Sequence, residues 1–301
     1  MKKPAITISQ SLIKMFMRNF NELEDDHICP RKIYCLTALR MRTESTLNNL
    51  RGLYFEDVAC GTDKNQINLP GDARTGKKTM ITKRIETQAH IFKEWLRYRD
   101  GIVNEENTKI KIYKRWDFDK NVIISGELDI FPLALKNERN DGPKYILTIL
   151  DLKLTQNVKS DYGKFCWGNI SRMDHTQAIM YHYLVRDIDY ELNDAINPGN
   201  KLRMLTEEIK DYLDAGLCEF RYYVADLQAN YSSDVFVYNL KPDDFKQLHE
   251  AIRKIVWRLR EYNEAEWPVN PSSDLCLGNP VQNIYKCPFE NCSSRRKEKE
   301  I

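Results

Sequence analysis

The stretches GELDI (residues 126–130) and ILDLK (residues 149–153) decide the fold of this chain. Both read as short strands that carry charged side chains among apolar ones. Because side chains alternate between the two faces of a strand, Asp151 and Lys153 share one face, whereas Leu152 points to the other. We therefore expect Leu152 in a core and the two charged groups together at a polar site.

A second acidic side chain belongs with this pair. Asp129 lies on the apolar run 122–133, and we expect it beside Asp151 and Lys153. Unpaired charge is costly to bury, so the cluster predicts a salt bridge, a metal site or both, and a metal site would favour phosphate chemistry. Glu127 shares strand parity with Asp129 and is either a reserve ligand or a solvent-facing partner for a lysine.

The composition describes a soluble globular chain. It has 301 residues, of which 42% are hydrophobic and 30% are charged, and this suits one catalytic core with terminal extensions. No stretch approaches the roughly 20 apolar residues that span a bilayer, and no signal peptide follows the first methionine. We expect a cytoplasmic protein with no membrane partner. The net charge of +2 does not by itself indicate nucleic acid.

Periodicity places helices and strands in a mixed α/β order. Helical spacing is predicted within residues 6–39 (a helix, a turn and a second helix), 46–60, 81–98, 171–185, 205–214 and 242–262. Strand-like runs rich in Ile, Val, Tyr and Leu cover residues 109–116, 121–132, 144–153, 217–227 and 233–240. We expect an N-terminal helical segment (1–45), a core (46–262) with a mixed central β-sheet flanked by helices, and a cysteine-containing tail (263–301) with a disordered charged end.

Four short motifs lie in order along these elements. They are Gly52-x-x-x-Glu56 followed by Gly61, then Gly126-x-x-Asp129, Asp151-x-Lys153 and Gln177-x-x-x-Tyr181. Any one of them is weak, since a surface salt bridge explains Asp-x-Lys equally well. Together they resemble the PD-(D/E)XK nuclease superfamily, specifically its RecB-like branch, which includes AddB-type recombination nucleases and CRISPR-associated adaptation nucleases. The resemblance spans residues 9–240 and implies a restriction-endonuclease-like α/β core.

The resemblance implies a metal site for phosphodiester hydrolysis. The carboxylates of Glu56, Asp129 and Asp151, with the backbone carbonyl of Leu152, are the expected ligands of Mg²⁺ or Mn²⁺, which prefer oxygen. Lys153 would orient or deprotonate the attacking water, or offset negative charge on the phosphate, and the resemblance leaves these roles open. Relatives often carry His at the first position, so metal preference is open as well.

The flanking motifs have narrower roles. Gln177 and Tyr181, at i and i+4, share one helix face and are expected to contact the metal-site groups or the nucleic-acid backbone. Taken alone, they would read as a surface glutamine and a core tyrosine. Gly52 is expected to let its helix approach the sheet closely. We assign no catalysis to His175 or His182, because lone histidines are more often surface or core residues.

Basic and aromatic residues alternate between the third and fourth motifs, at Lys159, Tyr162, Lys164, Phe165, Trp167 and Arg172. Such a mixture suits stacking of unpaired bases together with phosphate contacts. A loop whose aromatic side chains anchor it on the core explains the same pattern.

The cysteines raise a separate question about the two ends of the chain. In part of the RecB-like branch, one N-terminal and three C-terminal cysteines bind a [4Fe–4S] cluster, and here the resemblance assigns this role to Cys29, Cys276, Cys287 and Cys292. A structural Zn²⁺ would accept the same thiolates. The tail departs from the usual Cys-x-x-Cys spacing, so a metal-free remnant is the alternative. The other four, Cys35, Cys60, Cys166 and Cys218, are expected to be buried thiols.

These features together predict a Mg²⁺-dependent DNA nuclease. The expected activity is that of an exonuclease on DNA ends or single strands, in recombination, repair or phage-like DNA metabolism. The sequence has no Gly-x-x-x-x-Gly-Lys-Ser/Thr phosphate loop, so any helicase or recombination protein that works with it is a separate chain. The alternatives are a non-catalytic nucleic-acid-binding or assembly subunit that keeps the fold, and a restriction-type endonuclease.

Overall fold

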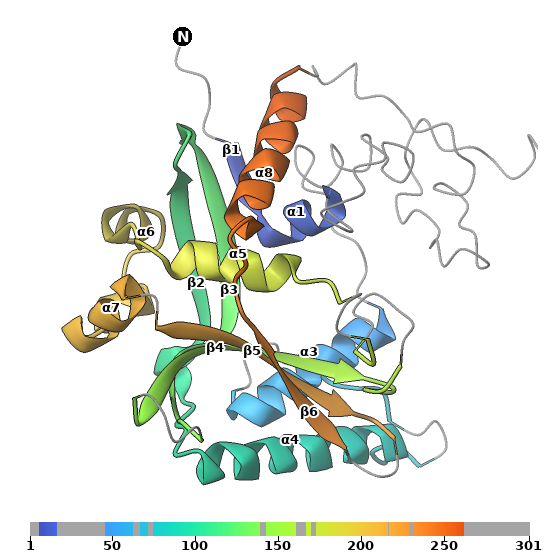
Figure 1. Ribbon diagram of the computed structural model, residues 1–301. Helices are drawn as coiled ribbons and strands as arrows, with labels where there is room; N and C mark the ends of the chain where they lie inside the picture. The colour runs from blue at the N-terminus through green and yellow to red at the C-terminus, as the bar shows by residue number, and fades with distance from the viewer. Residues whose placement is uncertain are drawn as a thin grey trace, which may run out of the picture. The chain divides into compact units, whose positions relative to one another are not determined.

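A computed structural model describes residues 6–16, 46–62, 67–71, 75–138, 143–160, 167–169, 173–215, 217–228 and 232–261 (Figure 1). The chain divides into two compact units. The first unit takes residues 1–10 and 46–245 and contains the sheet. The second takes residues 11–45 and 246–301 and includes most of helices α1 (Gln10–Phe16) and α8 (Asp244–Glu261).

The first unit is built on a six-stranded mixed sheet. Its strands are β1 (Ile6–Ser9), β2 (Thr108–Trp116), β3 (Asp119–Lys136), β4 (Tyr145–Thr155), β5 (Cys218–Asp226) and β6 (Ser233–Tyr238). β1 pairs with β3 and β4 with β5 in parallel, whereas β2–β3, β3–β4 and β5–β6 are antiparallel. The predicted fold class, a mixed sheet flanked by helices in an α/β chain, is confirmed.

Strand β3 is the hub of the sheet. Its Ile130 pairs with Thr108 of β2 and with Leu150 of β4, so β2 and β4 lie on opposite edges of β3. Residues 123–125 of β3 likewise pair with both β1 and β2. β1 and β4 therefore share one edge of β3. The pairing of β3 with β4 reaches only as far as the Ile130–Leu150 pair, although both strands continue beyond it.

Two helices cover one face of the strands. α3 (Leu47–Cys60) begins after the N-cap Thr46 and ends at Gly61, whose φ of 67° suits a glycine. α4 (Met80–Tyr98) begins after the N-cap Thr79. Their apolar side chains form one core with alternate residues of the strands, including Phe55, Ala59, Ile85, Ala89, Phe92, Ile130, Leu150, Leu152 and Tyr223. Leu152 thus lies in the core, as strand alternation predicts.

Helix α5 (Thr176–Val185) covers the opposite face (Figure 1). Phe220 of β5 makes ring contacts with Tyr181 and His182 of α5, whereas Tyr223 of the same strand packs with Phe92 of α4. Residues 220 and 223 have opposite parity on the strand, so the two sets of helices lie on opposite faces. All ten residues of α5 are buried, which is typical of a helix that is apolar around its whole circumference.

Most of the predicted elements are present, with two differences. Residues 6–9 form strand β1 and not the start of a helix, because they pair with β3. Helix α1 begins directly after them. The sequence prediction also lacked α6 (Tyr190–Ile196) and the short 3-10 helices Glu105–Asn107 and Lys201–Met204, which precede α7 (Glu207–Asp214). The domain limits at residues 45 and 262 stay predictions. Among the helices of the described residues, none is both long and apolar enough to cross a bilayer.

Candidate active site

The acidic side chains of GELDI and ILDLK meet where β3 and β4 stop pairing. Continued pairing would place Leu152 opposite Leu128, but the Leu152 N–H instead donates a 3.0 Å hydrogen bond to Oδ2 of Asp129. The carboxylate thus replaces a backbone acceptor of the ladder. Asp129 is 8% exposed and Asp151 is 0% exposed, so both carboxylates are buried and one is fixed by the main chain.

Lys153 lies against these acids, as the strand parity predicts. Its ammonium forms an ion pair with Oδ2 of Asp151 and a 3.3 Å hydrogen bond to the carbonyl oxygen of Leu152. Burial acts to lower the pKa of Lys153, but Asp151 and Asp129 outweigh it and raise the pKa above its usual value. Lys153 is therefore an ammonium at neutral pH in this arrangement.

Helix α5 supplies the next contacts. Gln177 Nε2 donates to Oδ1 of Asp151 at 2.5 Å and to the hydroxyl of Tyr181 at 3.0 Å. The Tyr181 hydroxyl in turn donates to the backbone carbonyl of Glu127 at 2.6 Å. Burial, with a further contribution from Asp151, raises the pKa of Tyr181 well above its usual value, so the hydroxyl keeps its proton. Gln177 is buried against Asp151 and is not a surface residue.

A glycine lets this helix come close to the sheet. A Cβ added to Gly126 would lie 2.7 Å from Leu184 Cδ1 and 3.2 Å from Tyr181 Cε1, both on α5. Gly126 therefore allows the approach that brings Tyr181 to β3. The sequence predicted the same role for Gly52. This prediction is wrong, because a Cβ at Gly52 would meet nothing within 4 Å.

Glu56 reaches the cluster through a lysine that the sequence reasoning missed. Lys109 Nζ forms an ion pair with Oε2 of Glu56 and lies 2.9 Å from Oδ1 of Asp129. Burial and the nearby Asp129 raise the pKa of Glu56 to about 7. Burial acts to raise the pKa of Asp129 as well, but Lys109 and Lys153 hold it below its usual value. Knowledge of the hairpin register, which sets Lys109 beside Asp129, would have revealed this contact.

Glu127, one of the residues left open, faces outward. Its side chain is 41% exposed and its carboxylate lies 3.6 Å from the ammonium of Lys111. Glu127 therefore matches the alternative of a solvent-facing partner for a lysine, and it does not match that of a reserve ligand.

The donor set suits a hard divalent cation by its chemistry. Glu56, Asp129 and Asp151 offer carboxylate oxygens and Leu152 offers a carbonyl, the ligand types that Mg²⁺ and Mn²⁺ prefer. When all are ionised, these three acids carry one more charge than the two lysines beside them, Lys109 and Lys153. Yet no group of three acidic, histidine or cysteine side chains among the described residues is arranged as a metal cage. The ammonium of Lys109 lies between Glu56 and Asp129 instead, and that of Lys153 pairs with Asp151.

The remaining predicted residues divide into two groups. Cys29, Cys276, Cys287 and Cys292, with Cys35, Cys166, Tyr162, Lys164, Phe165 and Arg172, lie outside the described residues. Of those described, Cys60 is a buried free thiol and Cys218 a partly exposed one, and burial raises the pKa of both to about 12. Lys159 is exposed. Trp167 is buried and packs on Tyr222 and Phe236, which favours the core-anchoring interpretation at this position.

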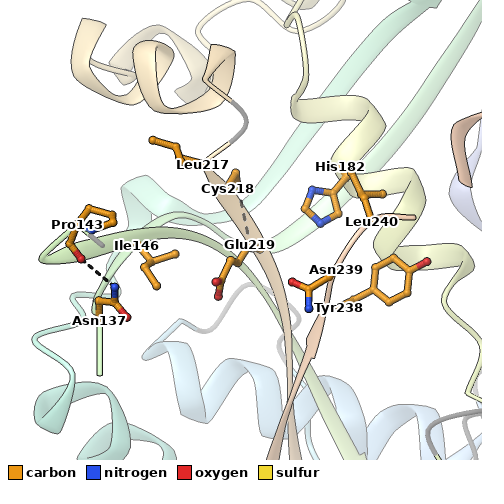
Figure 2. A pocket seen from close by; sticks show the side chains of 10 residues that line it. All are labelled: Asn137, Pro143, Ile146, His182, Leu217, Cys218, Glu219, Tyr238, Asn239 and Leu240. Carbon is orange, nitrogen blue, oxygen red and sulfur yellow. Dashed lines mark hydrogen bonds between the residues drawn. The ribbon is translucent and has the colours of Figure 1, made fainter. Parts of the chain in front are cut away.

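A separate hollow of about 440 Å³ lies where β4 and β5 begin (Figure 2). It is lined by Asn137, Pro143, Ile146, His182, Leu217, Cys218, Glu219, Tyr238, Asn239 and Leu240. The Nε2 atom of His182 is buried and has no hydrogen-bond partner among the described residues. None of the predicted catalytic residues lines this hollow.

Comparison with known proteins supports the fold. No protein-family model and no curated protein sequence matches the chain. A solved structure does match, that of a protein from Eubacterium rectale named "putative exonuclease", with a TM-score of 0.50 and 15% identity. The alignment covers 84% of this chain and 80% of that one. At this level of identity the likeness is one of fold.

Proposed function

We propose that this chain is a metal-dependent DNA nuclease of the PD-(D/E)XK type, in its RecB-like branch, and that it acts as an exonuclease. The observation that carries the proposal is the convergence of four sequence motifs on one buried cluster. Glu56, Asp129, Asp151 with Lys153, and Gln177 with Tyr181 come from four different elements and are linked by ion pairs or hydrogen bonds. The likeness in fold to a protein named as an exonuclease agrees with this function.

Each residue of the cluster has a definable task. Glu56, Asp129, Asp151 and the Leu152 carbonyl would hold a divalent cation, which supplies a more acidic bound water and positive charge at the phosphate. The Leu152 N–H orients Asp129, and Gln177 orients Asp151. Lys153, held as an ammonium by Asp151, is suited to stabilise negative charge that develops on the phosphate.

The test compares the wild type with Asp151→Asn, which keeps the shape of the side chain and removes its charge. Both proteins are incubated with Mg²⁺ or Mn²⁺ and with end-labelled linear, covalently closed circular, single-stranded and double-stranded DNA. The wild type should degrade substrates that have ends, and Asp151→Asn should be at least about 100-fold slower, as for loss of one strong electrostatic contact.

A matched control uses Glu127→Gln, an acidic side chain of β3 that faces outward to Lys111. It should keep the wild-type rate, whereas a reserve ligand would not. Cleavage of circular DNA would favour an endonuclease. DNA binding with equal and negligible turnover by wild type and Asp151→Asn on every substrate would overturn the enzyme proposal in favour of a binding subunit.

A further inference from the structure

Lys109 occupies an unusual place beside the candidate metal ligands. It lies at the start of β2, where Thr108 pairs with Ile130 and Ile110 pairs with Leu128, so it stands across from Asp129. Its side chain is 14% exposed, and its ammonium contacts one carboxylate of α3 and one of β3. A monovalent cation therefore lies between two acids that are expected to bind a divalent one.

The backbone at Lys109 holds the side chain there at a cost. Its φ of 52° falls in the left-handed region, which is unfavourable by about 1–2 kcal/mol for a residue with a Cβ. Neighbouring contacts fix the strained conformation, since the Thr108 hydroxyl donates to Asn104 O at 3.0 Å and Lys201 Nζ donates to Thr108 O at 3.1 Å. Strain of this kind is common at functional positions and calls for an explanation.

Electrostatics supply that explanation. Glu56 and Asp129 are both largely buried, and Asp129 makes Glu56 harder to ionise. With Lys109 between them, the pKa of Asp129 is lowered even though burial acts to raise it. Without a cation at this position, the two carboxylates would repel each other in a poorly solvated site.

We propose that Lys109 is a built-in counter-cation of the metal site, which holds Glu56 and Asp129 together in the metal-free protein and is displaced when a divalent cation binds. The inference rests on the proposed function, because it takes these two acids as metal ligands. It follows that Lys109 sets the metal affinity, since each binding event must first break two buried ion contacts.

Calorimetric titration with Mn²⁺ tests the proposal on the full chain. Lys109→Met keeps an unbranched side chain that is one atom shorter and removes its charge, so Mn²⁺ should bind at least about tenfold more tightly than to the wild type, a change of about 1.4 kcal/mol. Lys111→Met is the matched control, because Lys111 is the next lysine on β2 but is 56% exposed and pairs with Glu127. Its affinity should equal that of the wild type. Equal or weaker binding by Lys109→Met would overturn the proposal.

A second measurement uses the wild type and does not depend on how well the variant folds. An amine-reactive reagent, with sites counted by mass spectrometry, should modify Lys109 several-fold faster with saturating Mn²⁺ than with chelator, while Lys111 reacts equally in both. Metal binding without any change at Lys109 would refute the displacement and leave the nuclease proposal standing. If neither the wild type nor Lys109→Met binds Mn²⁺, the metal site itself fails, and both proposals fail with it.

Discussion

Polar groups are buried beside the middle and beside the start of the β4–β5 pair, with opposite results. At the middle, Asp151 is fully buried, and Lys153, with a side chain that is 21% exposed, stays an ammonium beside it. At the start, His182 of α5 lines the hollow together with Ile146, which lies five residues before Asp151 on β4. Burial lowers the pKa of His182 to about 4, so its ring is neutral at physiological pH. Both groups are largely removed from solvent, yet only Lys153 keeps its charge.

The difference lies in which groups the neighbouring acidic side chains pair with. Asp244 and Glu219 lie near His182 and act to raise its pKa, but both are engaged elsewhere. Asp244 accepts hydrogen bonds from the Tyr238 hydroxyl and the Lys241 N–H, and Glu219 pairs with Arg221. At the candidate site, each lysine makes its ion pair with an acid of that site. Direct ion pairing, and not proximity of acids alone, keeps a buried group charged here.

The largest test of this comparison removes one member of the buried pair. Lys153→Met leaves the fully buried Asp151 without its ammonium, and the free energy of unfolding should fall by about 3–5 kcal/mol at pH 7 without added metal. Adding Asp151→Asn to this variant removes the uncompensated charge and should restore most of the loss. Urea unfolding followed by tryptophan fluorescence measures both. Equal stabilities of the single and double variants would show that the pair does not hold the charge.

The second test asks whether His182 is neutral in the folded protein. Its pKa is about 4 folded and near 6.5 unfolded, so between these values the unfolded chain binds the extra proton. This contribution to stability is present above about pH 6.5 and is lost as the pH falls towards 4, by up to about 3 kcal/mol. His182→Gln should therefore lose less stability over this range than the wild type. His90→Gln, at an exposed histidine, should follow the wild-type curve.

Sequence reasoning reached the candidate site because its chemistry is written in local patterns. Strand parity put Asp151 and Lys153 on one face and Leu152 in the core, and helical spacing put Gln177 and Tyr181 on one face of α5. Lys109 was missed because its contact with Glu56 and Asp129 depends on the β2–β3 register and on a left-handed backbone. Neither the strand register nor this backbone conformation can be read from the order of the residues.

The same limit applies to elements whose form depends on distant partners. Residues 6–9 become a strand because β3 offers a parallel edge more than 100 residues later, whereas their own sequence runs without a break into α1. The same limit applies to single glycines. The sequence does not say which neighbours a Cβ at a glycine would meet, so close approach of a helix to the sheet, which was expected at Gly52, is found at Gly126 instead.

The smallest predicted effect uses these two glycines as a matched pair with opposite signs. Gly126→Ala puts a methyl group against Tyr181, whose ring is held by its hydrogen bond to Glu127, and against the end of the more adaptable Leu184 side chain. Overpacking of this kind typically costs about 1–3 kcal/mol, and we expect the lower part of that range because Leu184 can move. Gly52→Ala adds a methyl group in open space on α3 and should stabilise the protein by up to about 1 kcal/mol through helix propensity. Urea unfolding measures both. Helix α5 carries Gln177 and Tyr181 at the candidate site and His182 at the hollow, so Gly126→Ala should disturb both places. Equal effects of Gly126→Ala and Gly52→Ala on stability would mean that close packing of α5 on β3 does not support these two places.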